Sequence, residues 1–366
     1  MQGPFGQRGC AMTYELSPEL SVICPFYNEE KIIENAVRTL LERMRELDTT
    51  WELIVVNDGS TDSSKEIVSR ISDDDRRLIL LSYPVNRGRG FALRTGIDQA
   101  QGKIIITTEI DLSWGEDIVS RLYKQMIDHP QIDILIASPH LPGGGYKNVP
   151  RKRVLFSHYG NVVIRALMSN ATTMNTGMTR AYRCEVIKSL PLEQNRKEFH
   201  LEVIMKAQAF NYNFSEVPCV LEWKEYKHKG ERVKRKSSSK VNHLVLSHTL
   251  FSLFANPIRY VWGLGAVVVL ISFFFFVWSL FRLLLGLVSV FTITISLSLA
   301  IIALLLFVFG IIAQQGYMVQ REIWTLKRNL KGFQRELIEE RINAANQGEY
   351  PKDIQYEMEE ERATVG

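Results

Sequence analysis

The sequence predicts a mainly parallel α/β domain, followed by two membrane-spanning helices and a C-terminal amphipathic helix. In the first 140 residues, short apolar runs of β-forming residues alternate with amphipathic stretches of helical period. After Ile258 the composition changes to two long segments without charges. Apolar strands joined by helical crossovers are typical of a parallel sheet that is covered on both faces. Ligands of such sheets bind beyond the carboxyl ends of the strands, so we look for site residues there.

Each predicted element of the α/β domain is short and bounded by turn residues. Strands are expected at Leu20–Ile23, Leu53–Val56, Leu78–Leu81, Ile104–Thr107 and Ile132–Ile136. The helices between them are expected at Glu30–Arg45, Ser63–Ile71, Phe91–Ala100 and Glu116–Asp128.

The two charge-free segments are long enough to cross a bilayer. Tyr260–Phe281 would form a helix of about 33 Å, and Leu283–Gln320 has a strongly apolar centre. A buried core helix is the alternative reading of either segment. The short connection around Arg282 predicts a helical hairpin, which leaves the α/β domain and the C-terminal tail on one side. The Lys/Arg excess flanking the hairpin predicts that this side is cytoplasmic.

The segments that flank the hairpin are amphipathic or strongly charged. Lys224–Lys240 holds eight Lys/Arg against two acids, and residues 241–258 are expected to form an interfacial amphipathic helix. After the hairpin, apolar residues recur at 3-4-3-4 spacing: Ile323, Leu326, Leu330, Phe333 and Leu337. Two heptads do not establish a coiled coil, so packing on the chain's own domain and homo-oligomerisation both stay open. The tail from Glu349 to Glu361 is acidic.

Composition excludes some classes of function. A net charge of +4 is too small to indicate a nucleic-acid partner. The four cysteines lie far apart without a CxxC pair, which argues against a zinc site or a disulfide framework. The expected organisation is a flexible extension at 1–18, the α/β domain at 19–240, the interfacial helix at 241–258, two membrane spans at 259–315, and a cytoplasmic helix with its acidic tail at 316–366.

Polar residues follow the first two strands. Pro25 is expected to end the first strand, and the loop through Glu30 offers an aromatic face and a carboxylate. Asp58 directly follows the second apolar run, and Gly59 permits a sharp turn. We interpret Asp58 as a ligand-contacting residue. Ser60 and Asp62 are interpreted as turn and capping residues instead.

Two further motifs follow later strands. Asn86–Leu93 is a glycine loop that opens a helix, with Gly88 and Gly90 exposing amides that favour anionic oxygens. Glu109 and Asp111 follow the fourth strand at i and i+2. Two carboxylates at a strand end can converge on a hard divalent cation that is also held by diphosphate oxygens.

Together these motifs resemble family 2 glycosyltransferases with the GT-A fold. The carrying pieces are PFYNEE, VVNDGSTD, NRGRGFALRTG and EID, in this order. Thr176–Tyr182 is similar to the family's Gly-Phe-Arg-x-Tyr region, and Glu216-Val217-Pro218 matches its Glu-Val-Pro strand. With the two-helix anchor, the chain resembles the polyprenyl-phosphate branch, the relatives of dolichol-phosphate mannose synthase, over roughly residues 20–315.

The resemblance implies roles for particular residues. Pro25, Tyr27, Glu29 and Asp58 would hold the base and ribose of a nucleotide-sugar, beside the loop of Gly88 and Gly90. Asp111 and Glu109 would meet a divalent cation, Mg²⁺ or Mn²⁺, and the diphosphate. The acceptor phosphate would meet a basic and polar set: Arg153, Ser157 and Lys227.

The chain also departs from the family pattern. Glu109-Ile110-Asp111-Leu112-Ser113 stands where Asp-x-Asp-Leu-Gln is usual, so metal geometry and donor preference are open. Ala137-Ser138-Pro139-His140 stands where relatives have Gly-Ser-Arg, which leaves His140 or Lys147 as substitutes for an acceptor-binding arginine.

The implied activity is inverting transfer of a hexose, from GDP-mannose or a UDP-hexose, to the phosphate of a membrane polyprenyl or dolichyl phosphate. A processive polysaccharide synthase is one alternative, although Gln320–Trp324 lacks the Gln-x-x-Arg-Trp order and only one hairpin is expected. A non-catalytic nucleotide-sugar-binding membrane scaffold is the other alternative.

Overall fold

The computed structural model describes residues 18–151, 154–155, 157–159, 161–162, 172–223, 226–228, 231–233, 257–287 and 290–346. The chain divides into two compact units. The first comprises residues 1–149, 177–185 and 214–235, and the second comprises 150–176, 186–213 and 236–366. Residues 241–256 of the predicted interfacial helix, most of the basic run and the acidic tail lie outside the described residues, and residues 257–258 belong to the next helix.

A seven-stranded sheet forms the centre of the first unit, with strand order β3-β2-β1-β4-β7-β5-β8. Its strands are β1 Leu20–Phe26, β2 Trp51–Asp58, β3 Leu78–Tyr83, β4 Ile104–Thr107, β5 Ile134–Ser138, β7 Arg180–Arg183 and β8 Phe214–Pro218. Only β7 runs antiparallel to its neighbours. The five strands expected in the first 140 residues are confirmed, and so is the Glu-Val-Pro strand.

Pro25 does not end the first strand, because β1 continues to Phe26. The pairing of β1 with β4 ends at Ile23, whereas the pairing with β2 extends to Phe26. A residue without a backbone N–H is tolerated in a strand where one side has no partner.

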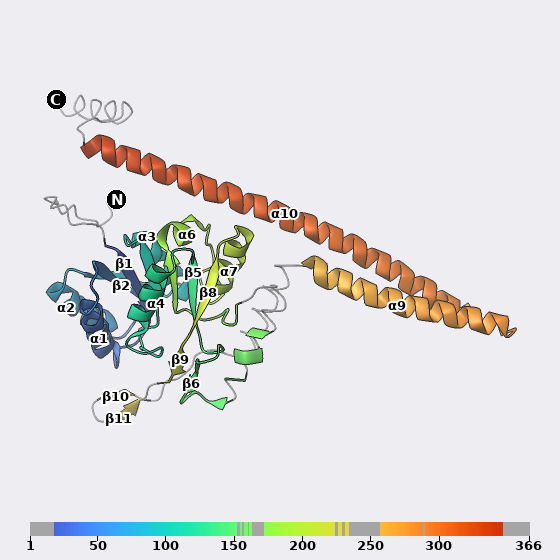
Figure 1. The fold of residues 1–366 in the computed structure, drawn as a ribbon, viewed down its shortest axis with the longest axis horizontal. Helices are drawn as coiled ribbons and strands as arrows, with labels where there is room; N and C mark the ends of the chain where they lie inside the picture. The colour runs from blue at the N-terminus through green and yellow to red at the C-terminus, as the bar shows by residue number, and fades with distance from the viewer. Residues whose placement is uncertain are drawn as a thin grey trace. The chain divides into compact units, whose positions relative to one another are not determined.

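Four helices cross between the parallel strands: α1 Ile33–Arg45, α2 Ser64–Asp74, α3 Arg89–Gln99 and α4 Ile118–Asp128 (Figure 1). Helix α1 packs beside α2 and α4, and α3 packs on β1 and β2. A Cβ at Gly96 would come within 2.5 Å of the Ile23 side chain, so glycine lets α3 approach the sheet closely. Right-handed crossovers place α3 on the opposite face from α1 and α2. The sheet is therefore covered on both faces, as predicted.

The antiparallel strand β7 brings a buried charge into the sheet. Arg180 pairs with Thr107 of β4 and Ile136 of β5 and is fully buried. Burial lowers the pKa of its guanidinium, and interactions with Tyr182 and Glu216 oppose that shift. The smaller elements are β6 Gly145–Lys147, β9 Val220–Glu222, β10 Tyr226–His228, β11 Glu231–Val233 and α6 Cys184–Ser189.

Helix α7, Phe199–Ala209, carries a buried ion pair in the second unit. The Nζ of Lys206 lies 2.6 Å from Glu202 Oε1, and both side chains are 2% exposed. Lys206 also donates to the carbonyl of Pro191, and Glu202 accepts from the backbone N–H groups of Glu193 and Gln194. These bonds satisfy both buried charges and attach the 191–194 loop to α7.

The second unit also contains two long helices, α9 Pro257–Leu284 and α10 Val290–Asn346 (Figure 1). Both are long and apolar enough to cross a membrane. Only 17% of the apolar window of each helix is buried within the protein, which disagrees with the alternative of a buried core helix.

Small and hydroxylated residues line the contact between α9 and α10. The Ser272 hydroxyl donates to the carbonyl of Ser296, and the Ser296 hydroxyl donates to the carbonyl of Ser272. A Cβ at Gly310 would lie 2.3 Å from the Trp262 ring, so glycine is needed for that contact. Close backbone approach through small residues, with hydrogen bonds across the contact, is typical of helix pairs in membranes.

Helix α9 ends in a Schellman motif. Gly286 has φ of +73°, its N–H bonds the carbonyl of Leu283, and the N–H of Leu287 bonds the carbonyl of Arg282. Helix α10 then runs for 57 residues without a break. The apolar span and the polar segment after position 315 are therefore parts of one helix.

The polar half of α10 contacts α7 and the loop before it. Trp324 is 5% exposed, with the Lys206 ammonium 5.3 Å from its ring centroid. Arg321 donates to the carbonyl of Ala209, and Lys327 pairs with Glu193. The predicted apolar stripe does not make this contact: its five side chains are 39–69% exposed. A different face of α10 packs on the chain's own domain.

Candidate active site

The parallel strands bring the predicted donor-site loops to one edge of the sheet. Phe26 at the end of β1 pairs with Asn57, and Asp58 at the end of β2 pairs with Tyr83 of β3. Strand β4 flanks β1 on its other side and leads to Glu109 and Asp111. The loops that carry Pro25, Asp58, Gly88 and Asp111 therefore share the carboxyl edge, as expected for this topology.

Reciprocal hydrogen bonds join the first two loops. The backbone N–H of Asn28 donates to Ser60 Oγ at 3.0 Å, and the N–H of Thr61 donates to Asn28 Oδ1 at 2.8 Å. The N–H of Glu29 donates to Ser64 Oγ at 2.9 Å. Asn28 has φ of +55°, a conformation that asparagine tolerates better than most residues. The neighbouring Tyr27 is 45% exposed.

The capping interpretation of Asp62 is confirmed. Its Oδ1 accepts from the backbone N–H of Ser64, the first residue of α2, at 3.0 Å. Its Oδ2 accepts from the N–H of Glu30. The carboxylate therefore starts a helix and holds the first loop in place.

Asp58 holds the glycine loop. Its Oδ1 accepts from the Tyr83 hydroxyl at 2.8 Å and from the backbone N–H of Arg87 at 2.8 Å, and both carboxylate oxygens lie 3.1 Å from the N–H of Gly88. The side chain is 5% exposed. Burial and the bond to Asp58 raise the pKa of Tyr83, so this hydroxyl remains a donor. Asp58 thus positions the loop that begins α3.

Gly59 and Gly88 are needed for this arrangement. A Cβ at Gly59 would lie 2.4 Å from the backbone N of Asn86, and φ there is +67°. Gly88 has φ of +98° and precedes the first residue of α3. Gly90 is buried in the first turn of that helix. The N-terminus of α3 therefore lies beside Asp58 at the carboxyl edge of the sheet, and a helix N-terminus is a favourable place for an anion.

Glu109 and Asp111 lie on a tight turn after β4. The backbone N–H of Ser113 donates to Asp111 Oδ1 at 3.1 Å, and Asp111 is 5% exposed. Leu112 has φ of +51°, which is costly for a leucine, by about 1–2 kcal/mol. Strained backbone of this kind concentrates at functional sites.

Glu109 connects this turn to the glycine loop. Its Oε2 accepts from Ser113 Oγ and from Trp114 Nε1, and its Oε1 lies 3.9 Å from a guanidinium nitrogen of Arg89 at the start of α3. Ser113 stands at a position where the sequence departs from the family pattern, and Trp114 follows it. Both donate to the carboxylate and orient it, a role that sequence reasoning missed.

The family model for glycosyl transferase family 2 matches residues 21–190, which include every strand end described above. The α/β domain is a family 2 glycosyltransferase domain.

The curated relatives are bacterial. An undecaprenyl-phosphate 4-deoxy-4-formamido-L-arabinose transferase from Photorhabdus laumondii is 28% identical over 193 residues, which cover 51% of this chain and 56% of the relative. The chain thus spans little more than half of that relative's length. The protein of the same description from Proteus mirabilis is 25% identical over 270 residues, covering 71% of this chain and 76% of the relative.

Solved structures resemble the fold. A mycobacterial protein aligns with a TM-score of 0.50 at 16% identity, covering 65% of this chain and 74% of its own. Glucosyl-3-phosphoglycerate synthase from Mycobacterium tuberculosis, in complex with Mn²⁺, uridine diphosphate and glucosyl-3-phosphoglycerate, aligns with a TM-score of 0.49 at 18% identity, covering 65% and 79%.

The donor set of the family 2 domain fits a hard cation only in part. Among the residues that the structure describes, no group of three or more His, Cys, Asp or Glu side chains gathers as a metal site. Glu109 and Asp111 offer carboxylate oxygens from one turn. Magnesium is usually bound through one or two carboxylates, with substrate phosphates and water completing the shell. Two carboxylates from one turn fit that pattern.

The residues expected at the acceptor belong to other elements of the chain. Ser157 is in the second unit, and its carbonyl accepts from the Asn161 side chain. Lys227 is in the hairpin of β10 and β11, and Arg153 lies outside the described residues. Their roles stay predictions.

The two candidate substitutes for a missing arginine both have partners. Lys147 Nζ lies 3.0 Å from Glu222, and His140 Nε2 lies 3.1 Å from the Tyr146 hydroxyl. The backbone N–H of Glu222 also bonds the carbonyl of Ser113, at 2.7 Å. That bond connects β9 to the turn of the two carboxylates.

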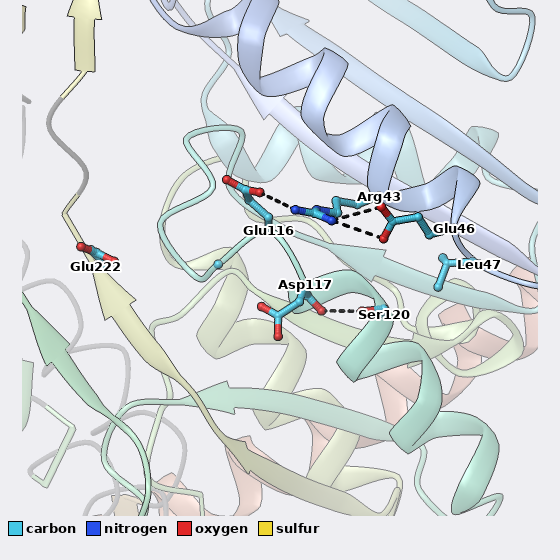
Figure 2. A pocket seen from close by; sticks show the side chains of 8 residues that line it. Arg43, Glu46, Leu47, Glu116, Asp117, Ser120 and Glu222 are labelled. Atoms are coloured by element: carbon cyan, nitrogen blue, oxygen red, sulfur yellow. Dashed lines mark hydrogen bonds and ion pairs between the residues drawn. The ribbon is translucent and has the colours of Figure 1, made fainter.

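Figure 2 shows a pocket that the sequence did not indicate. Its volume is about 590 Å³, and it is lined by the end of α1, residues 115–120 and Glu222. Arg43 pairs with Glu46 and Glu116 across its wall, and Asp117 adds another carboxylate. Four carboxylates against one guanidinium make this lining unfavourable for a diphosphate.

Proposed function

We propose that this protein transfers a hexose from a nucleotide-sugar, GDP-mannose or a UDP-hexose, to the phosphate of a membrane polyprenyl phosphate. The observation that carries the proposal is a family 2 domain on one chain with a helical hairpin suited to a membrane. The relatives named above act, by their names, with undecaprenyl phosphate. An acceptor of that kind keeps its phosphate at the membrane surface.

On the donor side, the three joined loops would receive the nucleotide. Tyr27 offers an exposed ring for the base, with Pro25 at the end of β1 before it and Glu29 on the loop after it. Asp58 would contribute mainly by holding the backbone of Arg87 and Gly88, and with it the start of α3, in place for the diphosphate. This positioning role replaces the direct contact with base or ribose as our main expectation for Asp58.

Asp111 and Glu109 would hold a divalent cation, either Mg²⁺ or Mn²⁺. When bound, such a cation neutralises charge on the departing nucleoside diphosphate. Arg89 already lies beside Glu109, so this chain brings a second positive charge to the same place. Ser113 and Trp114 fix the rotamer of Glu109 by donating to it.

The transfer itself is a single displacement. An oxygen of the lipid phosphate forms a bond to the anomeric carbon, and the bond from that carbon to the diphosphate oxygen breaks with inversion. The second pKa of a phosphate monoester is near 6, so the nucleophile is largely dianionic at neutral pH and needs no strong base. Basic residues would position it, and Arg153, Ser157 and Lys227 are our candidates.

The site would lie on the cytoplasmic face. A hairpin returns the chain to its starting side, and Lys/Arg-rich flanks favour the cytoplasm. Nucleotide-sugars would then reach the site from solution while the acceptor arrives in the bilayer.

The test uses the full chain in lipid nanodiscs with Mg²⁺ or Mn²⁺, a panel of radiolabelled nucleotide-sugars, and undecaprenyl or dolichyl phosphate. We expect label in a lipid-linked monosaccharide with one donor of the panel. The variant Asp111→Asn should lose at least about 100-fold in rate, as for a group that stabilises transition-state charge. Asp98→Asn makes the same change on the exposed side of α3 and should keep full activity.

Other outcomes identify the alternatives. Long polymer products would favour a processive synthase. Binding of a nucleotide-sugar without transfer to either lipid would favour a scaffold and end the transferase proposal. Full activity of Asp111→Asn would remove Asp111 from the site.

A further inference from the structure

Helix α10 uses one constant face for contacts within its chain. We label its positions a to g in heptads, with Ile323 at a. Position b is then Ser296 and Gly310 against α9. Further along, position b is Trp324, beside Lys206 of α7, and Lys331, whose Nζ lies 3.5 Å from the carbonyl of Leu190. One side of α10 therefore contacts both α9 and α7.

A second face of α10 is apolar and exposed along the polar half of the helix. Positions a and d from 319 onward are held by Val319, Ile323, Leu326, Leu330, Phe333 and Leu337, all 39–69% exposed. At about 100° per residue, the centre of this a/d face lies roughly 130° from position b. The same positions continue into the membrane span as Ile302, Leu305, Phe309 and Ile312, which are 47–61% exposed. The a/d face thus runs along both the span and the polar segment, with one interruption at Gly316.

If the membrane surface lies at the start of α9, the far end of this face stands outside the lipid. Trp262 of α9 packs on Phe307 and Gly310, and α9 begins at Pro257, so the start of α9 lies beside α10 near position 315. Leu337 is then about 33 Å further along a helix that rises 1.5 Å per residue. Even at a tilt of about 40°, that end stands roughly 25 Å above the start of α9.

We propose that the a/d face of α10 docks the same face of a second copy of this chain, as a parallel coiled coil. Two copies inserted in one membrane with the same topology direct their α10 helices the same way. In a parallel pair, position g of one helix lies opposite position e of the next heptad of its partner. Glu322 at g would then meet the lysine at position 327 of the second copy, which is 48% exposed and would be shared with its own Glu193. Asn329 at g would meet a glutamine at 334. Both pairs are complementary.

The apolar face also explains why the stripe is absent from the contact with α7. Positions b and e already hold the domain through Trp324 and Lys327. Positions a and d are left for a partner, and they keep the apolar period of a coiled-coil seam over three heptads. The coiled coil would hold two catalytic domains at one place in the membrane.

Cysteine cross-linking in lipid vesicles tests the contact. Leu326→Cys at d and Leu330→Cys at a should each form disulfide-linked dimers on mild oxidation. Gly332→Cys at c faces away from the seam, and the parent chain with its native cysteines sets the background. Equal cross-linking of Gly332→Cys would overturn the assigned face. Faster linking between Ile323→Cys and Leu337→Cys chains than within either variant would overturn the parallel orientation.

Light scattering in nanodiscs or mild detergent supplies the second readout. The wild-type protein should have at least twice the 42.0 kDa mass of one chain. Leu326→Lys with Leu330→Lys should be monomeric, whereas Thr325→Lys with Gly332→Lys adds the same charge at c and should stay associated. Helix content by circular dichroism confirms that both variants fold. A monomeric wild-type protein, or an unchanged mass of the a/d variant, would refute the proposal.

Discussion

Replacing Asp58 by alanine should release the glycine loop at the start of α3. The carboxylate accepts three hydrogen bonds, from Tyr83, Arg87 and Gly88, and alanine removes all of them. Arg87 is exposed and Gly88 half-buried, so water can replace part of what is lost. We therefore take the lower end of the usual range, about 1 kcal/mol per bond, or about 3 kcal/mol in total.

The measurement is hydrogen exchange at the amides of Arg87 and Gly88 in the ligand-free protein, because these amides report loop opening directly. A loss of about 3 kcal/mol speeds exchange roughly 100-fold. Asp58→Asn keeps an acceptor oxygen without its charge, and should speed exchange about 10-fold. Tyr83→Phe leaves both amide bonds in place and should change exchange less than about 5-fold.

This order of effects separates a positioning role of Asp58 from a purely ligand-binding one. Nucleotide affinity should fall in the same order, because a loop that is disordered before binding must be ordered when the diphosphate binds. Wild-type exchange rates in Asp58→Ala would refute the reasoning, and so would a Tyr83→Phe variant that exchanges as fast as Asp58→Ala.

Three further predictions concern stability. Gly59→Ala should lower the melting temperature by several degrees, because positive φ costs about 1–2 kcal/mol and the new Cβ would meet backbone atoms. In the control Gly145→Ala, the new Cβ meets nothing within 4 Å, so its melting temperature should be unchanged. Equal melting temperatures of the two variants would contradict this. Gly310→Ala should destabilise the hairpin by about 1–3 kcal/mol, because the new Cβ would meet the indole ring of Trp262. The melting temperature in detergent measures this, with Gly263→Ala, whose Cβ would meet open space, as the control. Asp75→Asn should lower the melting temperature by its full amount at pH 5–8 and by less below about pH 4. Hydrogen bonds from Arg77 hold the pKa of Asp75 well below its unfolded value, and the stabilisation they give disappears as the carboxylate is protonated. Melting temperatures of both proteins as a function of pH measure this, and a difference that stays constant down to pH 2 would contradict it.

The buried parallel strands could be predicted from sequence because each is an apolar run that ends at turn residues. The insertion of β7 between β4 and β5 could not. Its four residues include two arginines, and an antiparallel partner far along the chain has no local signature. Arg180 is buried there only because the sheet surrounds it on both sides.

The candidate site shows a similar division. The positions of Asp58, Glu109 and Asp111 follow from the topology of parallel strands. The hydrogen-bond and ion-pair partners of these carboxylates do not follow from the topology. Trp114, Ser113 and Arg89 reach Glu109 because Leu112 in the turn adopts a positive φ. No residue type in that turn signals the conformation. On α10, period alone indicated an apolar face, but Trp324 on another face makes the contact with α7.

Helix α7 packs against the same helix that carries the second candidate membrane span. Lys206 is buried beneath Trp324, and the backbone of Ala209 receives Arg321, 112 residues later in the chain. Trp324 and Arg321 follow the two apolar segments in the chain, so the Lys206 ammonium is covered only after both segments have been synthesised. A truncation that removes the hairpin to obtain a soluble catalytic domain would also remove this cover. The fold of α7 should therefore be checked in any shortened chain before its activity is interpreted.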